Sequence, residues 1–172
     1  MLTLEEVARQ CHLDTEDLQV ELIEQVIIPG VTQQAEALSG AAVRTAEYEE
    51  IWPAGFASGH ALDMGQANEI IEVATLAADG AKQVLNVPTR LQEDGREARL
   101  FFPMGRPVGE LAIRYRAGTD LEQHPGVRLW LLMHAATAHE QRETLVAGVS
   151  LAKLPGSFLD SLLADITVPP RF

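Results

Sequence analysis

The chain has 172 residues, of which 25 are acidic and 13 basic, and its formal net charge is −12. This excess of acid argues against a general nucleic-acid binder, which needs a basic face, and against docking on anionic membranes. The length suits a single domain, and no apolar run reaches the roughly 18 residues that would span a bilayer. The charge is uneven, because residues 1–50 hold eleven acids and two bases, a net of −9, while residues 51–172 have a net of −3.

The first third of the chain is expected to be helical. Thr3 and Glu6 form a capping-box pattern, which predicts a short helix over 3–10. A longer helix follows over about 14–40, with apolar residues at helical spacing and a Ser-Gly stop. Pro29-Gly30 interrupts this pattern, so either the helix kinks there or two helices meet.

The middle of the chain has the shorter period of β-strands. Two turn signals, Ala78-Asp79-Gly80 and Glu93-Asp94-Gly95, predict hairpins. Apolar and β-branched runs around them predict strands over 43–52, 70–76, 84–87, 89–92, 98–102 and 108–116.

Helical spacing returns near the C-terminus. Pro125 is suited to a first helical turn and predicts a helix over 125–144. A last short helix is expected from Pro155, and the two prolines of the tail exclude a helix there.

These elements predict an α+β fold that is mainly α-helical. The N- and C-terminal helices, 1–41 and 120–165, are expected to pack together as parts of one domain, because neither set hides an apolar face alone. An antiparallel β region, 42–118, is inserted between them, and an extended tail covers 166–172.

Catalytic and metal-binding patterns are weak in this sequence. His134 and His139 are five residues apart, a poor spacing for a shared metal. Cys11, the single cysteine, excludes an intrachain disulfide, and a buried apolar role suits it better than that of a nucleophile. We therefore expect no cofactor, no metal and no enzymatic activity. A small enzyme or a peptide-binding module, with a site near the loop 53–65, remains the alternative.

Two segments near the C-terminus have the character of contact sites. The tail is held extended by two prolines and ends in Arg-Phe, a form suited to a partner's groove, although a frayed terminus is the default. Its residues are Ile166, Thr167, Val168, Pro169, Pro170, Arg171 and Phe172. The run 139–143 ends the long helix, where Arg142 either meets carboxylates of a neighbouring subunit or is solvated.

Three stretches together resemble the head-tail connector, or adaptor, proteins of tailed bacteriophages and gene transfer agents. The first is Leu2-Thr3-Leu4-Glu5-Glu6-Val7 through Leu13-Asp14, with a helix that ends in Ala37-Leu38-Ser39-Gly40. The second is a strand that ends at Trp52-Pro53, with Pro103-Met104-Gly105-Arg106-Pro107-Val108. The third is Leu111 to Gly118, then Pro125 and a helix reaching Glu140-Gln141-Arg142-Glu143 and Val146-Ala147-Gly148. The sequence departs from the family pattern at His139, Gln141 and Pro29-Gly30.

The resemblance implies a non-enzymatic ring of about a dozen copies in the neck of a virion, assembled in the host cytoplasm. Such a ring docks on the portal protein, joins the head to a stopper or tail-completion protein, and lets DNA pass without specific binding. By the same resemblance, the tail 166–172 contacts the portal, and Arg142 and Glu143 pair between subunits. An acidic channel would repel phosphates, so Glu16, Asp17, Glu21 and Glu24 are expected to face the lumen or a basic portal rim.

Overall fold

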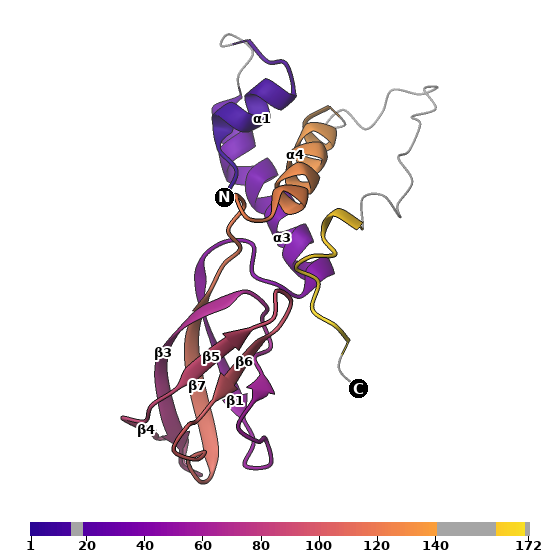
Figure 1. Ribbon diagram of the computed structural model, residues 1–172. Coiled ribbons are helices and arrows are strands. Elements are labelled where there is room, and N and C mark those ends of the chain that lie inside the picture. Colours follow the sequence, from indigo (N-terminus) through magenta and orange to yellow (C-terminus); the bar gives the residue numbers. More distant parts are fainter. Residues whose placement is uncertain (15–18, 141–160, 171–172) are drawn as a thin grey trace. The chain divides into compact units, whose positions relative to one another are not determined.

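The computed structural model in Figure 1 describes residues 1–14, 19–140 and 161–170. The chain divides into two compact units, which we call the helical unit (1–39 and 120–165) and the β unit (40–119 and 166–172). Within the described ranges, no helix has the length and apolar character needed to cross a membrane. Each unit is described by itself below.

The helical unit begins with the predicted capping box. Helix α1 covers Leu4–Gln10, and its N-cap is Thr3. The Glu6 backbone N–H donates to Thr3 Oγ1 at 3.3 Å, and the Thr3 N–H donates to Glu6 Oε2 at 2.8 Å. These reciprocal bonds satisfy amides that the first turn leaves without helical partners, so this prediction is confirmed.

The second helical run passes through Pro29 without a break. Helix α2 (Val20–Leu22), the π-helical segment η1 (Ile23–Ile27) and α3 (Ile28–Ser39) follow one another directly. In an α-helix a proline loses one hydrogen bond, and its ring clashes with the carbonyl four residues earlier. Here the chain widens just before Pro29, and the Ile28 N–H donates to the Ile23 carbonyl, five residues back. The helix ends as predicted, with Gly40 at a φ of +69°.

Helix α4 (Pro125–Glu140) starts at the predicted proline. Its inward side chains are Val127, Trp130, Leu131, Ala135 and His139. A Cβ at Gly126 would lie 2.9 Å from the Leu162 carbonyl oxygen, so glycine allows the segment after residue 160 to approach closely. The predicted end of this helix, 141–144, and the predicted start of the last helix at Pro155 lie outside the described residues.

The β unit contains two antiparallel sheets (Figure 1). The first has the order β1-β7-β3-β4, with β1 at Ala46–Trp52, β7 at Glu110–Ala117, β3 at Ala67–Leu76 and β4 at Lys82–Val84. The second has the order β2-β6-β5, with β2 at His60–Ala61, β6 at Ala98–Phe101 and β5 at Arg90–Glu93.

Both predicted hairpins are present. In the first, the Asp79 carboxylate accepts from the Ala81 N–H at 2.9 Å. This turn is tight, since the Ala77 N–H donates to the Ala81 carbonyl, and pairing therefore begins at Lys82. The strand predicted at 84–87 was placed too late for that reason.

One hydrophobic core joins the two sheets of the β unit. Its buried side chains include Trp52 from β1, Leu111, Ile113 and Tyr115 from β7, Val73 from β3, and Leu100 from β6. The predicted α+β class is confirmed. The expectation of a mainly helical protein is wrong, because the region between the helices is a separate unit with its own core and helices form a minority of the described residues.

Candidate functional site

The C-terminal tail is partly held on the β unit. Ile166 is fully buried, Thr167 and Val168 are half-buried, and Pro169 and Pro170 are exposed. None of residues 167–170 is helical, as the prolines predicted. Arg171 and Phe172 lie outside the described residues. Of the described residues in this predicted partner-binding tail, only Pro169 and Pro170 are exposed and so accessible to a partner.

Val168 rests against two glycines that come together from distant parts of the sequence. A Cβ on Gly40 would lie 3.3 Å from Val168 Cβ, and a Cβ on Gly65 would lie 2.7 Å from Val168 Cγ2. The Gly65 N–H donates to the Gly40 carbonyl at 3.1 Å, and the Ala42 N–H donates to the Gly65 carbonyl at 3.2 Å. We call this surface, formed by Gly40, Ala41 and Gly65, the tail seat.

The acidic residues expected to line a channel are only partly described. Glu21 in α2 and Glu24 in η1 are both exposed, and they flank Ile23, which is buried. Glu16 and Asp17 lie outside the described residues. The side chains of Glu21 and Glu24 therefore lie on the surface of the helical unit, where they can contact solvent or a partner.

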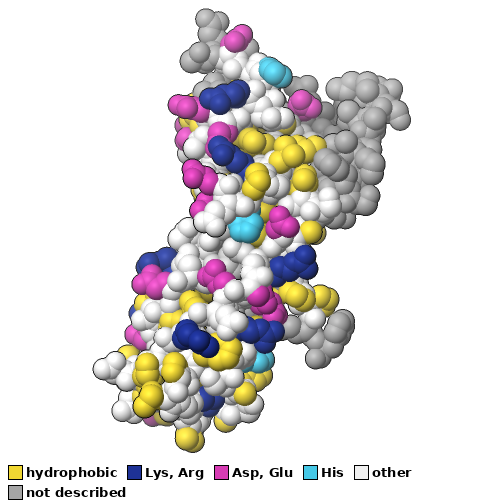
Figure 2. All heavy atoms as spheres, in the orientation of Figure 1, with side chains coloured by type: hydrophobic (Ala, Val, Ile, Leu, Met, Phe, Trp, Pro, Cys, Tyr) yellow, Lys and Arg dark blue, Asp and Glu magenta, His cyan; other side chains and the backbone are white. Residues whose placement is uncertain are grey.

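The negative charge of the first fifty residues is partly neutralised in space. On β1, Glu47 pairs with Arg116 and Glu49 pairs with Lys82 at 2.6 Å. Both bases belong to the later part of the chain: Arg116 lies on β7, directly opposite Glu47, whereas Lys82 lies on β4 of the same sheet. The visible face in Figure 2 accordingly shows acidic and basic side chains interspersed. The excess of acidic residues in the first fifty positions therefore does not produce a uniformly acidic surface.

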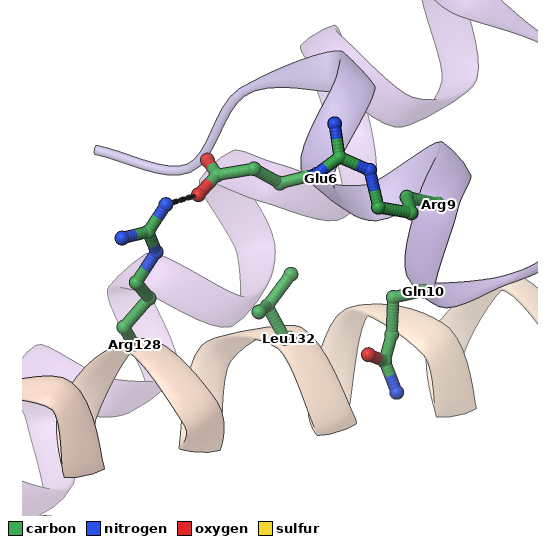
Figure 3. A pocket seen from close by; sticks show the side chains of 5 residues that line it. All are labelled: Glu6, Arg9, Gln10, Arg128 and Leu132. Atoms are coloured by element: carbon green, nitrogen blue, oxygen red, sulfur yellow. Dashed lines mark hydrogen bonds and ion pairs between the residues drawn. The ribbon is translucent and has the colours of Figure 1, made fainter.

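A pocket lies between α1 and α4 in the helical unit. Its volume is about 260 Å³, and it is lined by Glu6, Arg9, Gln10, Arg128 and Leu132. Figure 3 shows Arg128 reaching across from α4 to the Glu6 carboxylate. Burial raises the pKa of Glu6, but hydrogen bonds from Thr3 and the Arg128 pair outweigh it, so that this pKa lies below its usual value. The arrangement ties the two helices together through an ion pair.

A carboxylate that the sequence interpretation missed lies at the inner face of β1. Glu50 accepts from Trp52 Nε1 at 2.5 Å, from the Asp63 N–H at 2.8 Å and from the Tyr115 hydroxyl at 2.9 Å. Burial raises the pKa of Glu50, and the nearby Asp63 charge raises it further. The three hydrogen bonds lower this pKa but do not outweigh burial, so it lies above its usual value. Burial likewise raises the pKa of Tyr115. Strand alternation was the available signal, since Tyr48, Glu50 and Trp52 share one face.

The Glu50 network occupies the region that the alternative hypothesis assigned to a site. The Tyr115 hydroxyl also accepts from the Met64 N–H at 3.1 Å, so the carboxylate and the hydroxyl together fix the chain at 63–64. His60 packs its ring on Phe56, with centroids 3.8 Å apart, and lies edge-on to Trp52. These polar and aromatic groups contact one another, and their arrangement explains how the loop 53–65 is held in place.

The cysteine and the end of α4 are the remaining candidates from the sequence. Cys11 is half-buried rather than buried, and burial followed by the Glu140 charge raises the pKa of its thiol. Among the residues that the structure describes, no group of three His, Cys, Asp or Glu side chains could hold a metal ion. Arg142 and Glu143 lie beyond Glu140, the last described residue of α4, so their pairing stays a prediction.

Comparison with known proteins finds solved structures of similar fold. No family model and no curated protein matches the sequence. A chain in the virion of a native gene transfer agent (GTA) particle matches with a TM-score of 0.74 and 14 % identity, over 99 % of this chain and 91 % of that one. A chain in the neck of an empty GTA particle, computed with C6 symmetry, matches with a TM-score of 0.70 and 14 % identity over the same shares.

A third match comes from the neck of a native GTA particle computed with C12 symmetry. Its TM-score is 0.65 and its identity 15 %, over 99 % of this chain and 95 % of that one. The likeness covers nearly all of each chain. At these identities it establishes the fold: the chain has the architecture of chains found in GTA particle structures.

Proposed function

We propose that this protein is a structural head-tail connector of a tailed phage or phage-like particle. The observation that carries the proposal is the shared fold with chains of GTA necks and virions over 99 % of the sequence. Motifs along the whole chain, from the N-terminal capping box to the helix that starts at Pro125, support the same assignment. We propose no catalytic role.

In this proposal the protein forms a ring of about a dozen copies that docks on the portal protein and presents its other side to a stopper or tail-completion protein. Neck structures computed with C6 and C12 symmetry support a rotationally symmetric assembly. A head-to-tail contact between identical subunits produces a ring when its rotation closes. Arg142 and Glu143 would form part of that contact, and the tail would contact the portal.

The acidic side chains provide a physical reason why DNA can pass through such a ring. Glu21 and Glu24, which are exposed, and Glu16 and Asp17 would face the lumen or a basic portal rim. Carboxylates repel phosphates and, unlike Lys or Arg, displace no counterions from DNA, so the release that drives DNA binding is missing. DNA would then slide through without being held.

The proposal is tested by mixing the purified full-length chain with the portal protein. Native mass spectrometry and negative-stain images should show a ring, either of the chain alone or only when the portal is added. The chain with Arg142→Glu is the first variant to compare, and Glu110→Arg, an exposed charge reversal on β7, is its control. A chain that stays monomeric and does not bind the portal would contradict the proposal.

A further inference from the structure

The first residues of the tail, Ile166–Val168, pack against the β unit and fix the point from which the rest of the tail extends; we call them the root of the tail. Ile166 is fully buried, and Val168 fills the space left by the missing side chains of Gly40 and Gly65. From Pro169 on, the described tail is exposed. The tail thus changes from packed against the β unit at Val168 to exposed at Pro169.

Backbone hydrogen bonds hold the segments of the tail seat together. Ala41 and Gly65 form an isolated parallel bridge, and amides on both sides of that bridge are hydrogen-bonded. A Cβ at Gly65 would also lie 2.9 Å from the Arg96 carbonyl oxygen, so backbone closes that side of the seat. The neighbouring Gln66 side chain donates to the Gly95 carbonyl at 2.8 Å and fixes the hairpin that contains Arg96.

We propose that the tail seat is a binding site for Val168, which follows the turn that ends at Ile166, and that the segment Ile166–Val168 stays seated when the tail engages its partner. The inference rests on the proposed function and sharpens it. Ile166 and Val168 are positioning residues that fix where the tail leaves the β unit, and the portal is contacted by residues from Pro169 on.

The chemistry of the exposed part defines the kind of surface it fits. Two consecutive prolines hold the backbone extended and provide no N–H, so this part cannot add a hydrogen-bonded strand to a sheet through those positions. Recognition then depends on side chains in a groove. A fixed root lowers the entropic cost of binding, because each residue that must be ordered at binding costs about 1–2 kcal/mol, roughly a tenfold change in affinity.

A reversible covalent lock tests the proposal. We would make Gly40→Cys with Val168→Cys in a Cys11→Ser background, since Cys11 is the only native cysteine. The Cβ positions of 40 and 168 are 3.3 Å apart, close to the approximately 3.5–4.5 Å of disulfides. A side chain at position 40 is strained because φ is +69°, so the control is Gly40→Cys alone, which carries the same strain without the lock.

The oxidised, locked chain should bind the portal ring within about threefold of the same chain after reduction. Loss of binding on oxidation and its recovery on reduction would overturn the proposal, because it would mean that the tail leaves the seat. Val168→Asp, which places a charge in the seat, should weaken binding by about tenfold or more. Deleting 169–172 should abolish binding while leaving the lock able to form.

The seat is also testable without the portal. In the free chain, mild oxidation should convert the two introduced thiols of the double variant to a disulfide rapidly and completely, as measured by counting free thiols. Slow or incomplete conversion would overturn the seat itself. Complete conversion with no portal binding by the wild-type chain would instead contradict the proposed function and leave the seat standing.

Discussion

Replacing Glu50 by leucine should destabilise the β unit more than any nearby surface change. The substitution removes the acceptor for Trp52 Nε1, the Asp63 N–H and the Tyr115 hydroxyl. Trp52 and Tyr115 are each only 1 % exposed, so water cannot replace Glu50 as the acceptor for their donors. Asp63 is exposed, so water can accept from its N–H. A buried donor without a partner costs about 1–3 kcal/mol. Two such donors, offset in part by relief of the buried charge, give an expected loss of about 3 kcal/mol.

The matched control is Glu49→Leu, one residue away on the opposite face of β1. Glu49 pairs with Lys82 while both side chains are 42 % exposed, and such surface pairs contribute about 0–1 kcal/mol. Urea unfolding would be followed by fluorescence in a Trp130→Phe background, which leaves Trp52 as the only tryptophan and makes the signal report on the β unit. Equal losses for the two variants would refute the reasoning.

The raised pKa of Glu50 adds a pH dependence of known sign. A carboxyl whose pKa is higher in the folded state binds its proton more tightly there, so folding gains stability as the pH falls. The stabilising contribution is complete below the unfolded pKa of about 4.5 and is lost as the pH rises through the raised value. The stability advantage of wild type over Glu50→Gln should therefore decline with rising pH over that window. An advantage that grows with pH would contradict the assigned direction.

Three further changes have definite outcomes. Thr3→Ala removes the capping box and should lower the free energy of unfolding of the helical unit by about 1 kcal/mol, whereas Glu5→Ala beside it should have little effect; equal losses in urea unfolding would be inconsistent with a cap. Gly118→Ala would place a Cβ 2.6 Å from Thr45 Oγ1 and 2.8 Å from Thr45 Cα, so thermal unfolding should occur several degrees lower, and an unchanged midpoint would rule out this close approach. Arg142→Glu should weaken ring assembly if residue 142 pairs between subunits, and an unaltered ring in negative-stain images would return it to a solvated position.

Local signals in the sequence predicted the local structure well. The capping box at Thr3, the hairpin turn at Asp94-Gly95 and the helix start at Pro125 each depend on a few adjacent residues, and each is present. Alternation along 108–116 likewise predicted a strand, and β7 is the strand that pairs with both β1 and β3.

Contacts between distant residues could not be predicted in the same way. Glu50 and Tyr115 meet because β1 and β7 pair, and Val168 meets Gly40 and Gly65 because three separate segments converge. The path through Pro29 was left open because both alternatives assumed α-helical geometry, whereas the chain uses a π-helical segment. The charge asymmetry of the sequence was misleading as a spatial feature, since pairing partners of the β1 acids come from later strands.

The central claim is that this protein is a ring-forming connector in the neck of a particle. The most direct measurement is a cryo-electron microscopy reconstruction of the neck from particles produced with this chain. The proposal predicts density for the chain's two units, repeated around the particle axis next to the portal, with the tail from Pro169 on in contact with portal density. A neck that lacks the chain, or in which another protein occupies the position beneath the portal, would contradict it.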